Sequence, residues 1–194
     1  MQKGEKGMKL VEPIRDRKKL EVMKAVLKEG SLRNWCLFVL GINSGLRVSD
    51  IVRLKVSDVY DGKKVKDRIE LHEQKTGKYK SFPLSESAKK ALKEYLASIQ
   101  PEQDNFLFPS RKGGGPLSRS QVWLILHKAA DKTGIKEHIG THSMRKTFGY
   151  QAYKSGVDVY IIQDMLNHST PAVTKRYIGL SQEDKDRAYI MINL

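Results

Sequence analysis

One stretch of this sequence changes from a helical to an alternating period, and it constrains the fold more than any other feature. On both sides of residues 64–84, apolar residues recur at helical spacing between serine and glycine boundaries. Inside it, Arg68-Ile-Glu-Leu-His72 and Tyr79-Lys-Ser-Phe-Pro-Leu84 alternate on either side of a glycine turn. This pattern is typical of a β-hairpin. The sequence therefore predicts a mainly α fold with a small antiparallel β-sheet, an α+β architecture.

Boundary residues divide the helical parts of the chain. Ser31, Ser85 and a capping box at Ser118 are each followed by a helical apolar pattern. We also expect Ser49 to cap a short helix, and Thr141 to cap the helix after it. The predicted helices cover residues 15–29, 31–44, 85–99, 118–133, 142–155 and 158–167, with short ones after Pro171 and Ser181.

The charge balance indicates the kind of partner. Lys and Arg number 36 against 22 Asp and Glu, which gives a net charge of +14 over 194 residues. A domain this basic is expected to bind a polyanion, most simply nucleic acid. Cys36 is the only cysteine, which excludes an internal disulfide and a thiolate metal site. Without an apolar leader or a membrane-length apolar run, we expect a cytoplasmic protein.

Residues suited to phosphate chemistry follow one another in the last third of the chain. His142 and Arg145 are three residues apart, so a helix would place them on one face near its N-terminus, where anions bind. His168 and Tyr177 come next. A tyrosine phenol can attack a phosphate and hold it covalently. Each of these residues alone is more often an ordinary surface or core residue.

Two earlier segments add cations. Arg47 lies in a tight turn between two predicted helices, and Asp50 is placed to orient its guanidinium. An Arg47–Asp50 pair that serves only the fold is the alternative. The hairpin tip carries Lys75 and Lys78, which could reach a DNA phosphate or simply protect the sheet edge by charge.

Together these segments resemble the tyrosine recombinases, the phage integrase family. Ser44-Gly-Leu-Arg47-Val-Ser-Asp50 is similar to the family's first arginine box, and Gln74-Lys75-Thr-Gly-Lys78 to its lysine hairpin. Thr141-His142-Ser-Met-Arg145 resembles the second box, and Leu166-Asn-His168 followed by Tyr177 resembles the third. The resemblance covers essentially all of residues 12–185.

The resemblance implies a mainly helical catalytic domain that exchanges DNA strands without a metal or other cofactor. Tyr177 would attack a scissile phosphate to give a 3′-phosphotyrosine, and Lys75 would protonate the leaving 5′-oxygen. His142 is the candidate base, because an ordinary tyrosine stays protonated at neutral pH. The implied catalytic set is Arg47, Lys75, His142, Arg145, His168 and Tyr177, with Asp50 in support. Further DNA contacts are expected from Lys78, Arg119, Lys146, Lys175 and Arg176.

The resemblance also predicts the domain organisation. We expect a flexible segment over residues 1–11, a catalytic domain over 12–182, and a C-terminal tail over 183–194. The tail docks on a neighbouring protomer in a DNA-bound assembly, with a tetramer expected, or packs on its own core. Most relatives carry an extra N-terminal domain that closes around DNA, so we expect weak, salt-sensitive DNA binding from this chain alone.

Two other functions fit part of the pattern. A type IB topoisomerase-like enzyme would use the same cleavage chemistry to relax supercoils. A non-catalytic DNA-binding regulator would keep the fold but lack a catalytic residue. All six catalytic positions are filled, which favours the recombinase over the regulator.

Overall fold

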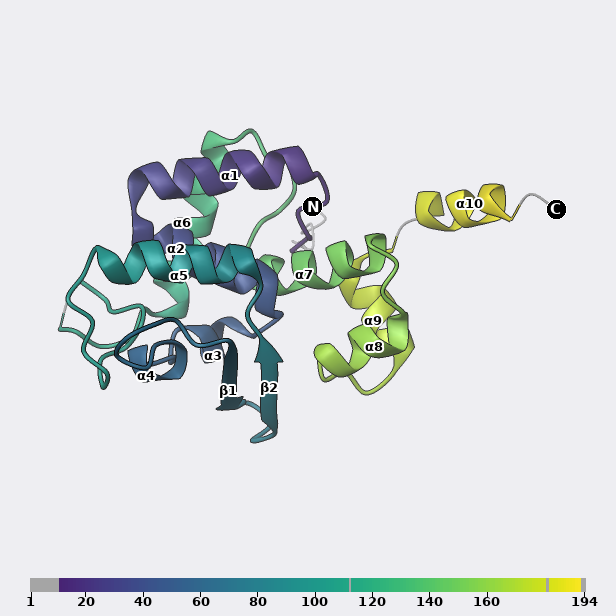
Figure 1. The fold of residues 1–194 in the computed structure, drawn as a ribbon. Helices are drawn as coiled ribbons and strands as arrows, with labels where there is room; N and C mark the ends of the chain where they lie inside the picture. The colour runs from purple at the N-terminus through teal and green to yellow at the C-terminus, as the bar shows by residue number, and fades with distance from the viewer. Residues whose placement is uncertain (1–10, 112, 181, 193–194) are drawn as a thin grey trace, which may run out of the picture.

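The computed structural model describes residues 11–111, 113–180 and 182–192, which form a helical body with one hairpin (Figure 1). Its helices and strands agree with the predicted mainly α architecture. In chain order the elements are α1 Arg17–Gly30, α2 Leu32–Ser44, α3 Val48–Ile51, α4 Val56–Val59, β1 Arg68–His72, β2 Tyr79–Pro83, α5 Glu86–Ala97, α6 Arg119–Lys132, α7 Ser143–Lys154, α8 Val159–Met165, α9 Pro171–Ile178 and α10 Gln182–Met191.

Helix α2 is the centre of the main core. Its residues from Trp35 to Leu40 are all buried, and it contacts α1, α5 and α7. Ser31 caps its start by accepting a hydrogen bond from the Asn34 backbone, and Gly45 ends it in the left-handed region at φ 61°. Because α2 is surrounded, the turn that follows it is held in a fixed position.

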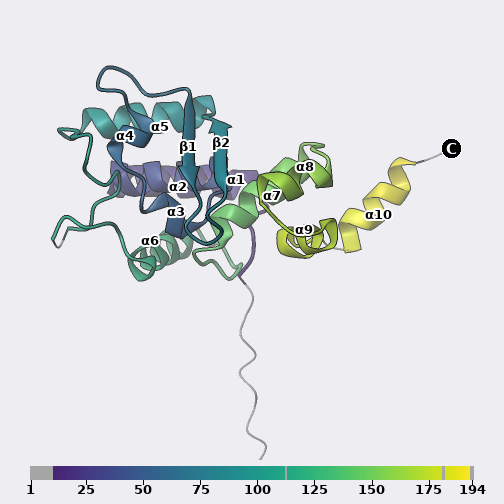
Figure 2. The same ribbon diagram turned by 90° about the horizontal axis from the view of Figure 1, so that it is seen from below.

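The hairpin forms as the alternating pattern predicts. β1 and β2 are antiparallel, with Ile69 opposite Phe82 and Leu71 opposite Lys80. Alternation places Ile69, Leu71 and the following Glu73 on the inward face, and both Ile69 and Glu73 are buried. One face of the hairpin therefore packs on the body while its tip extends from it (Figures 1 and 2).

A second, smaller cluster joins α7, α8 and α9. Its buried members are Tyr150, Ile162, Leu166 and Ile178. α7 and α9 approach closely at Gly149, where an added Cβ would lie 2.7 Å from Ile178 Cγ2. We call α8, α9 and the half of α7 that packs on them the C-terminal lobe.

Two predicted caps are wrong. Arg47 is the N-cap of α3, so Ser49 lies inside that helix. His142 is the N-cap of α7, and the Thr141 hydroxyl instead accepts a hydrogen bond from Arg119. Arg47 ends a short turn after α2, whereas Thr141 lies near the end of the longer loop 133–142, and tertiary contacts set the backbone path of both segments. The predicted Ser181 cap lies outside the described residues, as do residues 1–10 of the predicted flexible segment.

Helix α10 extends beyond α9 at the end of the described chain in both views (Figures 1 and 2). Lys154 of α7 forms an ion pair with Asp184 near its start, with 3.3 Å between Nζ and Oδ1. The apolar end is open, since Tyr189 and Met191 are each 79% exposed. None of the described helices has both the length and the apolar character needed to cross a bilayer.

Candidate active site

The predicted catalytic residues come from five segments that meet beside the hairpin tip. These segments are the α2–α3 turn, the hairpin, the start of α7, the α8–α9 loop and α9. A cavity of about 220 Å³ is lined by Arg47, Lys75, Arg119 and His142, together with residues of α3. Four side chains that are separated in sequence, and each able to donate hydrogen bonds to an anion, thus share one hollow.

Arg145 links the two parts of the molecule. Its side chain is 3% exposed and donates hydrogen bonds to the backbone carbonyls of Gly45 and Leu166. Gly45 ends α2 in the main body, and Leu166 ends α8 in the C-terminal lobe. Desolvation by burial lowers the pKa of Arg145, and the neighbouring phenol of Tyr177 acts in the opposite direction. The guanidinium is therefore fixed in orientation by both parts.

Arg47 is oriented by a residue that sequence reasoning missed. Its Nη1 lies 2.8 Å from Oε1 of Glu73, in an ion pair that lacks the angles of a hydrogen bond. Asp50 was expected in this place, but its Oδ1 accepts a hydrogen bond from the backbone N–H of Gln74 at 2.9 Å. The prediction that Asp50 orients Arg47 is thus corrected: Asp50 anchors the residue that precedes Lys75, and Glu73 faces the guanidinium.

The Glu73 carboxylate joins three segments of the site. Its Oε2 accepts hydrogen bonds from the Thr76 hydroxyl at 2.7 Å and from the Asn167 amide at 2.8 Å. Desolvation by burial acts to raise the pKa of Glu73, but the paired Arg47 and the hydrogen bonds from Thr76 and Asn167 outweigh it and lower the pKa to about 2. Glu73 therefore stays ionised at neutral pH although it is buried.

Tyr177 lies against the two predicted histidines. Its hydroxyl is 3.4 Å from His142 Nδ1, and its ring packs edge-on against His168 with 4.8 Å between centroids. Lys146 Nζ lies over the same ring, 5.2 Å from its centroid. Burial raises the pKa of the Tyr177 phenol, while the charge of Arg145 acts to lower it. The phenol is consequently protonated at neutral pH and needs a base to become a nucleophile.

Both histidines are kept neutral by their surroundings. Burial, followed by the charge of Arg145, lowers the pKa of His168 to about 4. Burial and the nearby charge of Arg119 also lower the pKa of His142. His168 Nδ1 lies 3.0 Å from the Thr174 hydroxyl, which fixes the ring. A neutral His142 has a free nitrogen lone pair that can accept the phenol proton.

Two lysines tie the hairpin to the end of α8 and to the α8–α9 loop. Lys78 Nζ donates to Asn167 Oδ1 at 3.1 Å, and Lys80 Nζ donates to the Met165 carbonyl at 2.8 Å. Lys80 shares the inward face with Glu73, and desolvation lowers its pKa to about 8. Sequence reasoning missed Glu73, Lys80 and Asn167. The strand alternation could have indicated Glu73 and Lys80, because it places an acidic and a basic residue on the inward face of the hairpin.

The other predicted DNA contacts differ in position. Arg119 faces the cavity, and Lys146 covers the Tyr177 ring. Lys175 and Arg176 are exposed in the last turn of α9, beside the proposed nucleophile in sequence. Their charged groups are therefore open to solvent close to Tyr177 in the sequence.

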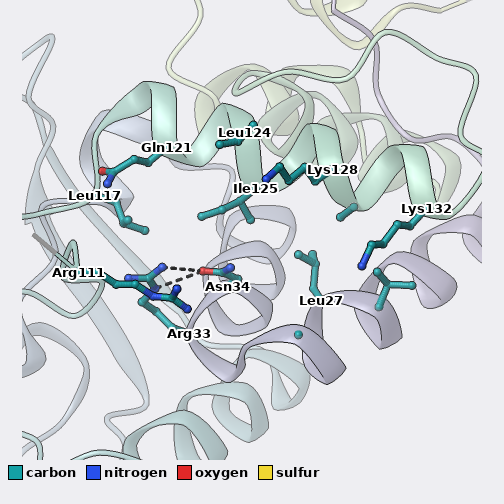
Figure 3. Close-up of a pocket in the computed structure, with 13 residues that line it drawn as sticks. Leu27, Arg33, Asn34, Arg111, Leu117, Gln121, Leu124, Ile125, Lys128 and Lys132 are labelled. Carbon is teal, nitrogen blue, oxygen red and sulfur yellow. Dashed lines mark hydrogen bonds between the residues drawn. The ribbon is translucent and has the colours of Figure 1, made fainter.

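A separate pocket of about 360 Å³ lies between α1, α2 and α6 (Figure 3). It is lined by apolar residues such as Leu27 and Ile125 and by Arg33, whose guanidinium donates to Asn34. None of the predicted catalytic residues lines it. Within the described part of the chain, no group of three His, Cys, Asp or Glu side chains is placed to hold a metal ion.

Comparison with known proteins identifies the family. The model of the phage integrase family matches residues 15–184. The probable integrase/recombinase YoeC of Bacillus subtilis is 40% identical over 182 residues, which cover 94% of this chain and 97% of that protein. The tyrosine recombinase XerD of Corynebacterium glutamicum is 31% identical over 156 residues, 78% of this chain, but the match spans only 50% of XerD.

Solved structures agree on the fold. The crystal structure of XerA recombinase superposes with a TM-score of 0.76 at 21% identity, covering 100% of this chain and 67% of XerA. A post-cleavage complex of the site-specific recombinase XerH with difH DNA gives 0.72 at 20% identity, covering 93% of this chain and 53% of XerH. This chain belongs to the phage integrase family, the tyrosine recombinases, which break and rejoin DNA.

Proposed function

We propose that this chain cleaves DNA through Tyr177 and rejoins it by the reverse reaction. The phenolic oxygen forms a bond to the scissile phosphorus while the bond from phosphorus to the 5′-oxygen breaks. The phenol proton passes to His142, and Lys75 gives a proton to the leaving 5′-oxygen. One observation carries the proposal: the Tyr177 hydroxyl lies 3.4 Å from His142 Nδ1, next to the buried Arg145.

The arginines are suited to the charge that develops at phosphorus. Two guanidinium groups present planar sets of donors that match the non-bridging oxygens of a phosphate. Arg47 lines the cavity beside Lys75 and His142, and its ion pair with Glu73 at 2.8 Å orients the guanidinium there. His168, which is neutral, can add a further hydrogen-bond donor. Because the phosphotyrosine ester resembles the original diester, the reaction is reversible and needs no nucleotide.

The geometry supports cleavage in cis. Tyr177, His142 and Arg145 of one chain already lie together, so the nucleophile attacks the phosphate that its own chain binds. A mixture of Tyr177→Phe and Arg145→Ala chains tests this point on a nicked DNA site selected from a random library. Cleavage in cis leaves the mixture inactive, whereas recovered cleavage would show that tyrosine is donated between protomers.

DNA is the expected partner, in an assembly of several protomers. The net charge of +14 and the exposed Lys175 and Arg176 support DNA binding. The exposed apolar end of α10 favours docking on a neighbouring protomer, and we propose a tetramer on two DNA duplexes. Deleting residues 189–194 should abolish self-association on DNA. Unchanged self-association would contradict the docking role.

Strand exchange separates recombination from topoisomerase-like relaxation. The same protein is incubated with two labelled duplexes that carry the selected site and, separately, with a supercoiled plasmid. A recombinase gives joined products from the two duplexes. Relaxation of the plasmid without exchange between the duplexes would favour the topoisomerase-like function. Because the chain spans about half of XerD, both assays include a duplicate with an added N-terminal DNA-binding domain from a relative.

A further inference from the structure

Glu73 occupies an unusual place for an acid in a site that binds phosphate. It is 2% exposed, and its carboxylate faces a cation that is expected to hold the negative substrate. Burying a charge is costly unless it is paired and hydrogen-bonded. It also weakens the attraction of Arg47 for phosphate, because the two opposite charges lie 2.8 Å apart. A buried acid that also weakens phosphate binding is expected to have a function that offsets these two costs.

The partners of Glu73 indicate that role. Oε1 pairs with Arg47 in the α2–α3 turn, and Oε2 accepts hydrogen bonds from Thr76 in the hairpin tip and from Asn167 in the α8–α9 loop. Each partner is within two residues of a predicted catalytic residue or is itself one. A single carboxylate therefore fixes the relative positions of Arg47, Lys75 and His168.

Asn167 is adapted to this contact. Its backbone has φ 49°, the left-handed region that favours glycine. Among the described non-glycine residues it is the only one with positive φ. Its side chain donates to Glu73 and accepts from Lys78, so the same amide connects the hairpin twice. Glycine would relieve the backbone but would remove both hydrogen bonds.

We propose that Glu73 is a positioning residue: it anchors Arg47 and, through Asn167, holds the hairpin against the loop that carries His168. This inference rests on the proposed function, because it assigns the carboxylate to the assembly of that same site. Glu73 does not touch the phosphate. Its negative charge weakens the attraction of the site for phosphate, but its bonds fix the arrangement of the groups that do touch the phosphate.

The proposal predicts opposite effects on binding and on cleavage. Glu73→Gln removes the charge that opposes phosphate and, at the same time, releases Arg47. DNA affinity should stay the same or rise, while single-turnover cleavage of a selected nicked site falls between about tenfold and a hundredfold, because the arginine is misplaced. A merely structural role would instead lower affinity and cleavage together.

Two further variants make the test specific. Asn167→Gly keeps the backbone path and should slow cleavage by about threefold to tenfold. Combined with Glu73→Gln, it should add less than its separate effect, because both act through one network. Glu70→Gln is the matched control: Glu70 is exposed on the same hairpin, and its carboxylate accepts from Tyr79. We expect Glu70→Gln to cleave like wild type.

Amide hydrogen exchange gives a readout that does not depend on cleavage. The Gly77 N–H donates to the Glu73 carbonyl, and the His168 N–H donates to the Gln163 carbonyl. If the network ties these segments together, Asn167→Gly speeds exchange at both amides. Wild-type cleavage by Glu73→Gln, or equal losses of affinity and cleavage, would overturn the proposal. If the wild-type chain forms no covalent adduct even with an added N-terminal DNA-binding domain, the proposed function fails instead. Unchanged exchange in Asn167→Gly would then overturn the link between the hairpin and the α8–α9 loop.

Discussion

The main body and the C-terminal lobe hold their parts of the site in different ways. The body is built on one large core around α2, and it supplies Arg47 from a turn and Lys75 from the hairpin. The lobe has four buried cluster residues, and it supplies His168 and Tyr177. α7 spans both, since Met144 packs in the large core and Tyr150 in the small one.

Because of this difference, the turn that carries Arg47 and the helix that carries Tyr177 should differ in local stability. A region with few buried apolar contacts opens locally at a lower free energy than a region in a large core. We therefore expect the turn with Arg47 to stay fixed while α9 and Tyr177 adjust to the DNA. Arg145 is the exception, because it is bonded to both regions.

The largest effect should come from changing the residue that joins the two regions. Arg145→Lys keeps the charge but cannot reach both the Gly45 and Leu166 carbonyls, and it loses the planar set of donors. We expect single-turnover cleavage to fall by about a thousandfold, as for loss of a preorganised oxyanion donor together with its orientation. Circular dichroism confirms folding. Cleavage within tenfold of wild type would show that Arg145 does not couple the regions.

Lys75 tests the contribution of the body to leaving-group chemistry. Lys75→Met should slow cleavage of ordinary DNA by about a hundredfold, the usual loss for a missing general acid. A substrate whose leaving group is a nitrophenolate needs no proton, so the variant should cleave it almost as fast as wild type does. A variant that is equally slow on both substrates would place Lys75 in phosphate binding instead.

The contact between α7 and α9 offers a smaller perturbation. In Gly149→Ala the added Cβ meets Ile178 at 2.7 Å and Leu166 at 3.1 Å, so α9 must shift and carry Tyr177 with it. We expect cleavage to fall about tenfold, because reacting atoms are displaced by a fraction of an ångström. Gly30→Ala is the control, since nothing lies within 4 Å of a Cβ there. Equal activities of Gly149→Ala and Gly30→Ala would mean that other residues of the lobe move and Tyr177 keeps its position.

The two regions should also respond to acid in different pH windows. His168 in the lobe has its pKa lowered from 6.5 to about 4, so only the unfolded chain takes up a proton as the pH falls through this range. Its contribution to stability is complete above pH 6.5 and is lost toward pH 4. The pKa of Glu73 is lowered from 4.5 to about 2, so the hairpin loses its contribution later, between pH 4.5 and 2.

Urea unfolding as a function of pH measures this. The free energy of unfolding should decline between pH 6.5 and 4 in wild type, and the slope should be shallower in His168→Gln. Glu73→Gln should instead flatten the decline below pH 4.5. If both variants kept the wild-type slope in these windows, the two groups would not be the ones that titrate.

Local sequence signals predicted the elements of this fold well. The hairpin, the Ser31 and Ser118 caps and the end of the second helix at Ser44 depend on residues close in sequence, and each lies where it was expected. Ser49 and Thr141 fail as caps because packing between helices that are distant in sequence sets the backbone in the segments before α3 and α7. The six predicted catalytic residues gather around one site.

The partners within the site were harder to predict. Asp50 is three residues from Arg47, so sequence proximity favoured that pair, but the hairpin brings Glu73 closer to the guanidinium. Arg145 is held by carbonyls 100 and 21 residues away, which no local pattern indicates. Long-range backbone contacts of this kind follow from the complete fold.

The most direct test of the central claim is covalent capture of DNA by Tyr177. A nicked duplex carrying a site selected from a random library is incubated with wild type and with Tyr177→Phe, and the products are separated on a denaturing protein gel. The account predicts a protein–DNA band for wild type and none for Tyr177→Phe, which should still bind the duplex in a mobility-shift assay. A covalent band of equal intensity from Tyr177→Phe, or none from a wild-type chain that carries an added N-terminal DNA-binding domain, would contradict it.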